Sequence, residues 1–263
     1  MWNLEECAGK TAIITGNGRY ITYEKLDFMR KEFAGLMEER GSVFMIAADT
    51  VSMAAAYTGC VEQERQLLVS DENISEEKFK NFVMQYQPRY IYLPVRSSVA
   101  ELAAWIGKEN SLMIYAGDEY VLFQMNSNYG ALQSGDGIWE VSPDADRLRL
   151  RQMRKAENRE HIIFSPSVCT EIRMEIMKYC ISNGKTMILA ESEPDSEIFW
   201  KIAEWYGADA ILLEQIPEGK RIRERVEQNR KNIILLKEKP LFSKLHKFVG
   251  GKQTGRHNKG TEE

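Results

Sequence analysis

The chain has 263 residues, of which 43% are hydrophobic and 28% are charged, and its net charge is −4. This composition is typical of a globular protein and excludes a disordered, collagen-like or coiled-coil chain. No uncharged apolar run approaches the ~20 residues of a membrane helix, and no basic and apolar leader opens the chain, so we expect a cytoplasmic protein without a membrane partner.

The first block, residues 1–142, alternates strand-like and helix-like segments. Periodic apolar residues predict helices, and short apolar runs bounded by Gly, Asn or Asp predict strands. Strands are expected at 11–15, 19–22, 42–47, 66–70, 90–93, 111–116 and 120–125, and helices at 24–40, 50–59, 75–86 and 99–106. Gly41 should end the first helix, and Ser75 should cap the third.

A charged linker or helix is expected over residues 143–160, and a second block over 161–238 repeats the alternation. Its strands are expected at 161–165, 186–190, 210–213 and 232–236, and its helices at 171–182, 195–206 and 218–230. In the second helix we expect Ile198, Phe199 and Ile202 to face inward. This β-α-β order predicts an α/β protein with parallel sheets covered by helices and an N-terminal β-hairpin.

The end of the chain is basic. Residues 221–263 carry 12 Lys and Arg against 5 Asp and Glu, whereas residues 1–220 carry 23 against 34. A basic tail can bind nucleic acid, an anionic membrane or an acidic protein. Because residues 250–263 have almost no apolar side chains, we favour a disordered tail over 239–263, and nucleic-acid binding is not expected.

Residues 10–94 resemble the start of the AMP-forming acyl and aminoacyl adenylating enzymes. The segment "KTAIITGNGRYITYEKLDFMRKEFAGLMEERG" is similar to the family's opening hairpin and a helix with Tyr-x-x-Leu, here Tyr23 and Leu26. The segment "SVFMIAADTVSMAAAYTGCVEQ" is similar to its strand and small-residue helix ending in Tyr-x-Gly, here Tyr57 and Gly59.

Residues 161–217 resemble a later β-α-β-α-β block of the same family. There a Pro-x-x-His loop precedes a helix, a glycine and two further strands, and Pro166, Gly184 and Pro217 fall in the corresponding places. The resemblance implies the fold of the family's N-terminal domain, and in complete members an activity that uses ATP and Mg²⁺.

The departures from the family pattern bear on activity. The family holds the ATP phosphates in a Gly-rich loop, where bare backbone must approach the phosphate, and we expect that loop between the two blocks. Residues 138–183 contain no glycine and a single threonine, Thr170. Cys169 replaces the family histidine, and the Tyr-Gly-x-Thr-Glu motif, the hinge and the catalytic-Lys domain have no counterpart.

We therefore predict no catalytic, cofactor-binding or metal-binding residues, and no cofactor for the chain alone. The first hypothesis is a non-catalytic binding or assembly module, with a full-length adenylating enzyme or an acyl carrier protein as partner. The second is half of a split adenylating enzyme, in which a complementing fragment supplies ATP and Mg²⁺ chemistry. The third is an unrelated two-part α/β binding protein.

Several short motifs have a functional and a structural interpretation. Gly16-Asn17-Gly18 lacks the third glycine of a nucleotide loop, so a hairpin turn is favoured, and Gly135-Asp136-Gly137 is favoured as a surface turn. Cys169 follows a strand, but no His or Asp partner can be identified, so a buried, inert cysteine is favoured. Ser165 and Ser167 do not form a GxSxG elbow.

The remaining polar and aromatic residues favour structural roles. Arg147, Arg149, Arg151, Arg154, Lys155 and Arg159 could bind a phosphate, but they have no interleaved aromatic residues, and a solvated face is favoured. The tryptophans are expected in or beside the core. The four cysteines (Cys7, Cys60, Cys169 and Cys180) lack the spacing of a zinc site or disulfide framework.

Overall fold

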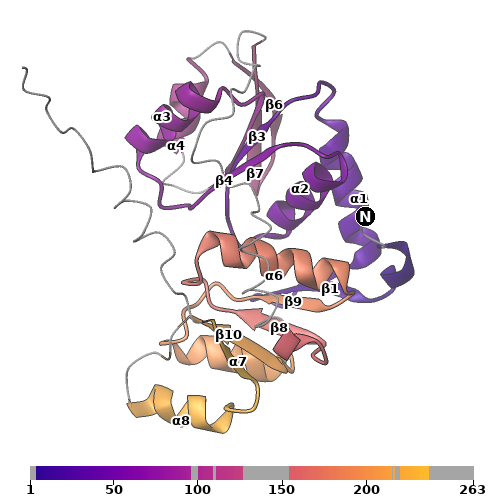
Figure 1. Cartoon of the computed structure of the whole chain (residues 1–263), viewed down its shortest axis with the longest axis vertical. Helices are drawn as coiled ribbons and strands as arrows, with labels where there is room; N and C mark the ends of the chain where they lie inside the picture. Colours follow the sequence, from indigo (N-terminus) through magenta and orange to yellow (C-terminus); the bar gives the residue numbers. More distant parts are fainter. Residues whose placement is uncertain are drawn as a thin grey trace, which may run out of the picture.

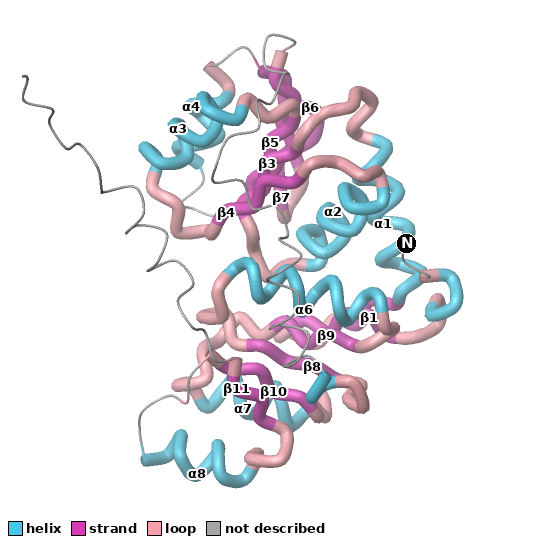
Figure 2. Tube along the Cα trace, viewed as in Figure 1, coloured by secondary structure: helices cyan, strands magenta, loops and turns pink. Residues whose placement is uncertain are grey.

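The computed structural model describes residues 4–95, 100–108, 111–126, 154–214, 216 and 220–236, and the structural account is confined to them. Their strands form two sheets with helices between and outside them (Figure 1), and Figure 2 shows the same layers by element type. No helix in these ranges combines the length and apolar character needed to cross a membrane.

The six-stranded sheet is parallel except at one edge, where the N-terminal hairpin adds an antiparallel pair. The hairpin joins this sheet because β1 pairs in parallel with β9, from Ile13 beside Met187 to Thr15 beside Leu189. In spatial order the strands are β11 (Ile233–Leu235), β10 (Ala210–Leu213), β8 (His161–Phe164), β9 (Thr186–Leu189), β1 (Thr11–Thr15) and β2 (Tyr20–Thr22).

The five-stranded sheet is mixed. Strand β3 lies parallel to both its neighbours, whereas β7 lies antiparallel to both of its own. In spatial order the strands are β4 (Leu67–Ser70), β3 (Val43–Ile46), β5 (Tyr90–Pro94), β7 (Tyr120–Met125) and β6 (Ser111–Ala116).

Helices cover both faces of each sheet. Between the sheets lie α1 (Tyr23–Gly35), α2 (Val51–Glu62) and α6 (Thr170–Ser182). The outer face of the five-stranded sheet is covered by α3 (Glu76–Tyr86) and α4 (Ala100–Ile106). The outer face of the six-stranded sheet is covered by α7 (Glu197–Trp205) and α8 (Lys220–Gln228). Short 3-10 helices occupy Glu5–Cys7 and Arg154–Ala156. The largest apolar cluster fills the middle layer and contains side chains of both sheets.

Hydroxyl side chains fix where the helices begin. Thr22, Thr50, Ser75 and Ser196 cap α1, α2, α3 and α7, each accepting a backbone N–H from the first turn. The cap predicted at Ser75 is therefore confirmed. Small residues make α2 suitable for the middle layer: a Cβ on Gly59 would lie 3.1 Å from the backbone oxygen of Arg30 on α1.

The predicted α/β fold, with its hairpin and helix-covered parallel strands, is confirmed. The domain boundaries stay a prediction. Residues 143–153 of the expected linker and the whole expected tail, 239–263, lie outside the described residues. The N-terminal hairpin lies in the sheet made by the second block, so the two sheets do not correspond to two continuous sequence blocks.

Three local predictions are wrong. Helix α1 ends at Gly35, not near Gly41, because the Arg65 guanidinium binds the carbonyls of Met37 and Glu39 and holds that segment outside the helix. Ile198 is 58% exposed, since the buried arc of α7 is centred on Phe199 and Ala203. Trp205 is 69% exposed on the same side of α7 as Ile198.

Candidate functional site

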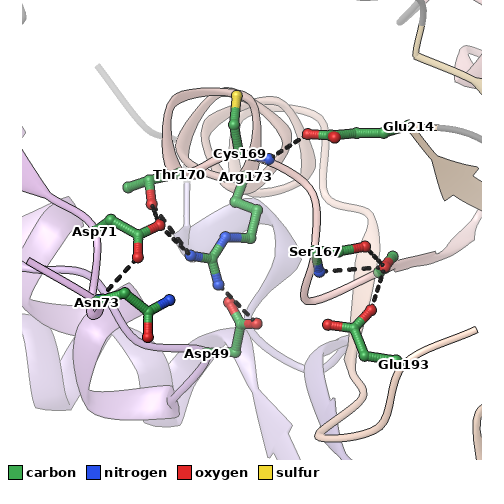
Figure 3. A network of polar contacts seen from close by, with 10 residues as sticks. Asp49, Asp71, Asn73, Ser167, Cys169, Thr170, Arg173, Glu193 and Glu214 are labelled. Carbon is green, nitrogen blue, oxygen red and sulfur yellow. Dashed lines mark hydrogen bonds and ion pairs between the residues drawn. The ribbon is translucent and has the colours of Figure 1, made fainter. Parts of the chain in front are cut away.

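Polar side chains gather where the carboxyl ends of strands from both sheets approach one another (Figure 3). They follow five parallel strands: Asp49 after β3, Asp71 after β4, the segment 165–170 after β8, Glu193 after β9 and Glu214 after β10. In open α/β sheets, ligands bind beyond the carboxyl ends of the strands. This junction is therefore the candidate site.

A buried arginine joins the two sheets at the junction. Arg173 on α6 has a side chain only 5% exposed, and its Nη1 lies 2.9 Å from Asp49 Oδ2. Its Nη2 donates to Thr170 Oγ1 at 3.1 Å and lies 3.9 Å from Asp71 Oδ2. Its Nε has no hydrogen-bond partner among the described residues. The charge of Arg173 is thus balanced by carboxylates from the opposite sheet.

Asp71 is held in its ionised form. Burial raises the pKa of this carboxyl, but the Asn73 backbone N–H, the Thr170 hydroxyl and the Arg173 charge together outweigh burial and lower the pKa below its ordinary value. Thr170 Oγ1 donates to Asp71 Oδ2 at 2.9 Å, and Asn73 N donates to Asp71 Oδ1 at 2.8 Å. Asp71 therefore remains an acceptor at neutral pH.

Two serines and a glutamate form a second polar group beside the first. Ser165 Oγ donates to Glu193 Oε2 at 3.0 Å and lies 2.6 Å from Ser167 Oγ. The backbone N–H of Ser167 also donates to Ser165 Oγ, at 3.2 Å. Ser165 is buried, at 1% exposure, whereas Ser167 is exposed.

Glutamates from other elements occupy the N-termini of two of the helices that follow these strands, α6 and α2. Glu214 Oε1 accepts the backbone N–H of Cys169, the N-cap of α6, at 2.6 Å. Glu119 Oε2 accepts both the backbone N–H and the hydroxyl of Ser52, at 3.2 and 2.5 Å, in the first turn of α2. These helix ends carry partial positive charge and unpaired N–H groups, which the protein satisfies with its own carboxylates.

The arrangement offers paired carboxylates, hydroxyl groups and one paired arginine. Across the described ranges, no group of three His, Cys, Asp or Glu side chains could hold a metal ion. The hydroxyl of Ser167 is an exposed polar group that connects through Ser165 to the partly buried Glu193 carboxylate.

The structure brings together some of the residues singled out in the sequence. Partly buried Cys169 lies at the same strand end as buried Ser165 and exposed Ser167. The expected hairpin turn at Gly16-Asn17-Gly18 is confirmed, with Gly18 at φ +85°. All four cysteines are free, and Cys60 and Cys180 are buried.

In the charged segment before β8, Arg159 is bonded to the rest of the fold and Lys155 is not buried. Arg159 donates to the Lys231 carbonyl at 2.9 Å and to Asn232 Oδ1 at 3.4 Å, while Lys155 is exposed. Gly135-Asp136-Gly137 and Arg147, Arg149 and Arg151 lie outside the described residues.

The sequence analysis missed Arg173, Asp49 and Asp71. A usable signal was present for the two aspartates, because each follows a predicted parallel strand and the carboxyl ends of such strands collect ligand-binding groups. Arg173 had no such signal, since it lies inside a helix with ordinary amphipathic spacing.

Neither a protein-family model nor a curated protein matches the sequence. Solved structures do match. The luciferase-like enzyme from the nonluminescent Zophobas morio mealworm aligns with a TM-score of 0.58 at 11% identity, over 88% of this chain and 68% of that one. ATP-bound MatB from Rhodopseudomonas palustris aligns with a TM-score of 0.51 at 14% identity, over 80% of this chain and 48% of that one.

The amide bond synthetase McbA from Marinactinospora thermotolerans aligns with a TM-score of 0.54 at 11% identity, over 80% of this chain and 47% of that one. The chain thus spans about half the length of MatB and of McbA. Over most of its own length, it has the fold of the AMP-forming adenylating enzymes.

Proposed function

We propose that this protein is a binding or assembly module built on the adenylating-enzyme fold, and that it does not form an acyl-adenylate by itself. A full-length adenylating enzyme or an acyl carrier protein is the proposed partner. A strand order unlike that of the adenylating enzymes would favour the third hypothesis, an unrelated α/β protein. The chain instead shares their fold, which counts against that hypothesis.

The observation that carries the proposal is that glutamates occupy the N-termini of α6 and α2, two of the helices that begin at the strand ends. A nucleotide phosphate is bound at such places by free backbone N–H groups and the positive end of the helix. In α6 the Cys169 N–H is bonded to Glu214, and in α2 the Ser52 N–H is bonded to Glu119. A polyphosphate would have to displace a carboxylate at either end and would meet its negative charge.

The sequence supports the same conclusion. Phosphate loops need glycine because the phosphate approaches bare backbone, and residues 138–183 contain none. Without positioned donors, the charge that develops during phosphoryl chemistry is not stabilised, and such stabilisation is a large part of catalysis. Residues 127–153 lie outside the described residues, so this support comes from the sequence alone.

A second candidate function is half of a split adenylating enzyme. This candidate is supported by the extent of the structural match, which covers 46–56% of the lengths of CmiS6, MatB, McbA and IdnL1. In this case a second polypeptide would supply the phosphate loop and the catalytic lysine.

Isothermal titration calorimetry with ATP and Mg²⁺ tests both candidates. The chain is titrated alone, and again after mixing with the purified products of neighbouring reading frames. We expect no heat of binding for the chain alone. Binding only in a mixture would identify a split enzyme, whereas binding by the chain alone would overturn the proposal. Release of pyrophosphate with a panel of carboxylic acids gives the matching test of activity.

A further inference from the structure

We propose that Ser167 is a nucleophile that accepts an acyl group from a neutral ester or thioester, with Ser165 and Glu193 carrying its proton away. This inference goes beyond the proposed binding role and does not depend on it. It rests on the direction of the hydrogen bonds in the Ser167–Ser165–Glu193 chain (Figure 3).

Counting protons fixes that direction. A serine hydroxyl has one proton to donate and two lone pairs that accept. Because the ionised Glu193 can only accept, the single proton of Ser165 lies in its 3.0 Å bond to Glu193 Oε2. In the 2.6 Å contact between the two serines, Ser167 must then be the donor. The Ser167 proton points inward, and its lone pairs remain for an electrophile.

Ser165, Ser167 and Glu193 differ in exposure and in hydrogen bonding, as their roles of relay, nucleophile and base require. Ser165 is buried and also accepts the Ser167 backbone N–H, which holds its oxygen in place. Ser167 is exposed at the carboxyl end of β8, where a ligand can reach it. Glu193 takes part in no ion pair within the described ranges, so its charge remains to receive a proton. Activated nucleophiles need such a connection to a base within hydrogen-bond reach.

The local charge favours an acyl donor over a phosphoryl donor. Glu193 and Glu214 lie on either side of the segment that carries Ser167, and Glu191 and Asp195 are exposed on the same loop as Glu193. A phosphate anion would be repelled by these carboxylates, whereas a neutral ester or thioester would not.

The proposed step is balanced without a further reactant. Ser167 Oγ bonds to the carbonyl carbon as its proton moves to Ser165 Oγ and the Ser165 proton moves to Glu193 Oε2. The bond from that carbon to the leaving oxygen or sulfur breaks, and the leaving group takes the proton from Glu193. The products are O-acyl-Ser167 and an alcohol or thiol.

Labelling followed by peptide mass spectrometry tests the proposal. The full chain is treated with p-nitrophenyl acetate and, separately, with a neutral alkyl fluorophosphonate. We expect a stoichiometric adduct on Ser167 that forms at least tenfold faster than any adduct on Ser75. Ser75 is the matched control, because it is an exposed serine that caps a helix and its hydroxyl bonds to no carboxylate of the described segments. Acetyl phosphate, which is anionic, should label Ser167 more slowly than the ester does.

Variants separate proton transfer from simple packing. Glu193→Gln and Ser165→Ala should each slow labelling of Ser167 at least tenfold, and Glu193→Asp, which restores a carboxylate, should recover part of the rate. Urea unfolding checks that each variant remains folded. Labelling of Ser167 no faster than that of Ser75, or an unchanged rate in folded Glu193→Gln, would overturn the proposal.

Discussion

The Arg173 guanidinium and the Asp49 carboxylate form an ion pair between the two sheets, with 2.9 Å between Nη1 and Oδ2. Only 5% and 13% of their side chains are exposed, and α6 and the loop after β3 thereby meet at one point. Removing charges from water is costly, so a buried pair fixes an arrangement more than it adds stability. We expect this pair to set how α6 lies against the start of α2.

Arg173→Met should destabilise the protein by about 3–5 kcal/mol, because it removes the buried cation that lies beside the largely buried Asp49 carboxylate. Urea unfolding, followed by far-UV circular dichroism, measures the loss. The control is Arg225→Met, which removes a more exposed pair with Glu197, whose side chains are 30% and 44% exposed, and it should cost about 0–1 kcal/mol. Equal losses in the two variants would show that the Arg173 pair has no special structural role.

Asp71 makes the stability depend on pH in a defined direction. Its pKa is lowered in the folded protein, because the Asn73 N–H, Thr170 and Arg173 outweigh the opposing effect of burial. Its contribution is therefore fully present above the unfolded value of about 3.9 and is lost as the pH falls through the folded pKa. Asp71→Asn should unfold more easily than wild type at pH 7, and the two curves should converge toward pH 2. A constant difference across that range would contradict this account.

Much of the fold could be predicted because its signals are local. The turn at Gly16-Asn17-Gly18, the cap at Ser75 and the apolar spacing of α3 each lie within a few residues. The pairing of β1 with β9 had no such signal, since Ile13 and Met187 meet only in the folded sheet. The early end of α1 likewise depends on Arg65, which lies far along the chain from the Met37 carbonyl that it binds.

The candidate site was harder to predict for the same reason. The sequence favours an inert Cys169 because no His or Asp partner can be identified for it, and it disfavours a reactive Ser165 because the GxSxG elbow is missing. In the structure Glu214 accepts the Cys169 backbone N–H and Glu193 accepts the Ser165 hydroxyl, and these glutamates lie 45 and 28 residues further on. A sequence reveals which residue types follow each strand, whereas the strand order decides which of those residues meet.

Glu214→Gln tests the occupied N-terminus of α6. Replacing the carboxylate by a neutral amide removes the favourable interaction with the helix end, and we expect a loss of about 0.3–2 kcal/mol. Thermal unfolding of both proteins at low and high salt measures the effect. Glu224→Gln, at an exposed position on α8, is the control and should change little. A Glu214→Gln protein as stable as wild type would mean that the carboxylate contributes nothing at this helix end.

Tyr23→Phe tests the connection between the N-terminal hairpin and the second block. The Tyr23 hydroxyl is fully buried and donates toward the carbonyls of Lys185 and Cys180, at 2.7 and 3.0 Å. Removing it takes the hydroxyl donor from the Lys185 carbonyl, whereas the Cys180 carbonyl keeps the backbone N–H groups of Lys185 and Asn183, so the variant should lose about 1–3 kcal/mol. Amide hydrogen exchange should increase at the end of α6 and at the start of β9 together, since one hydroxyl donates toward the Cys180 and Lys185 carbonyls. Tyr20→Phe, on an edge strand and 60% exposed, provides the control. If exchange increased at only one of the two elements, the hydroxyl would not be the link between them.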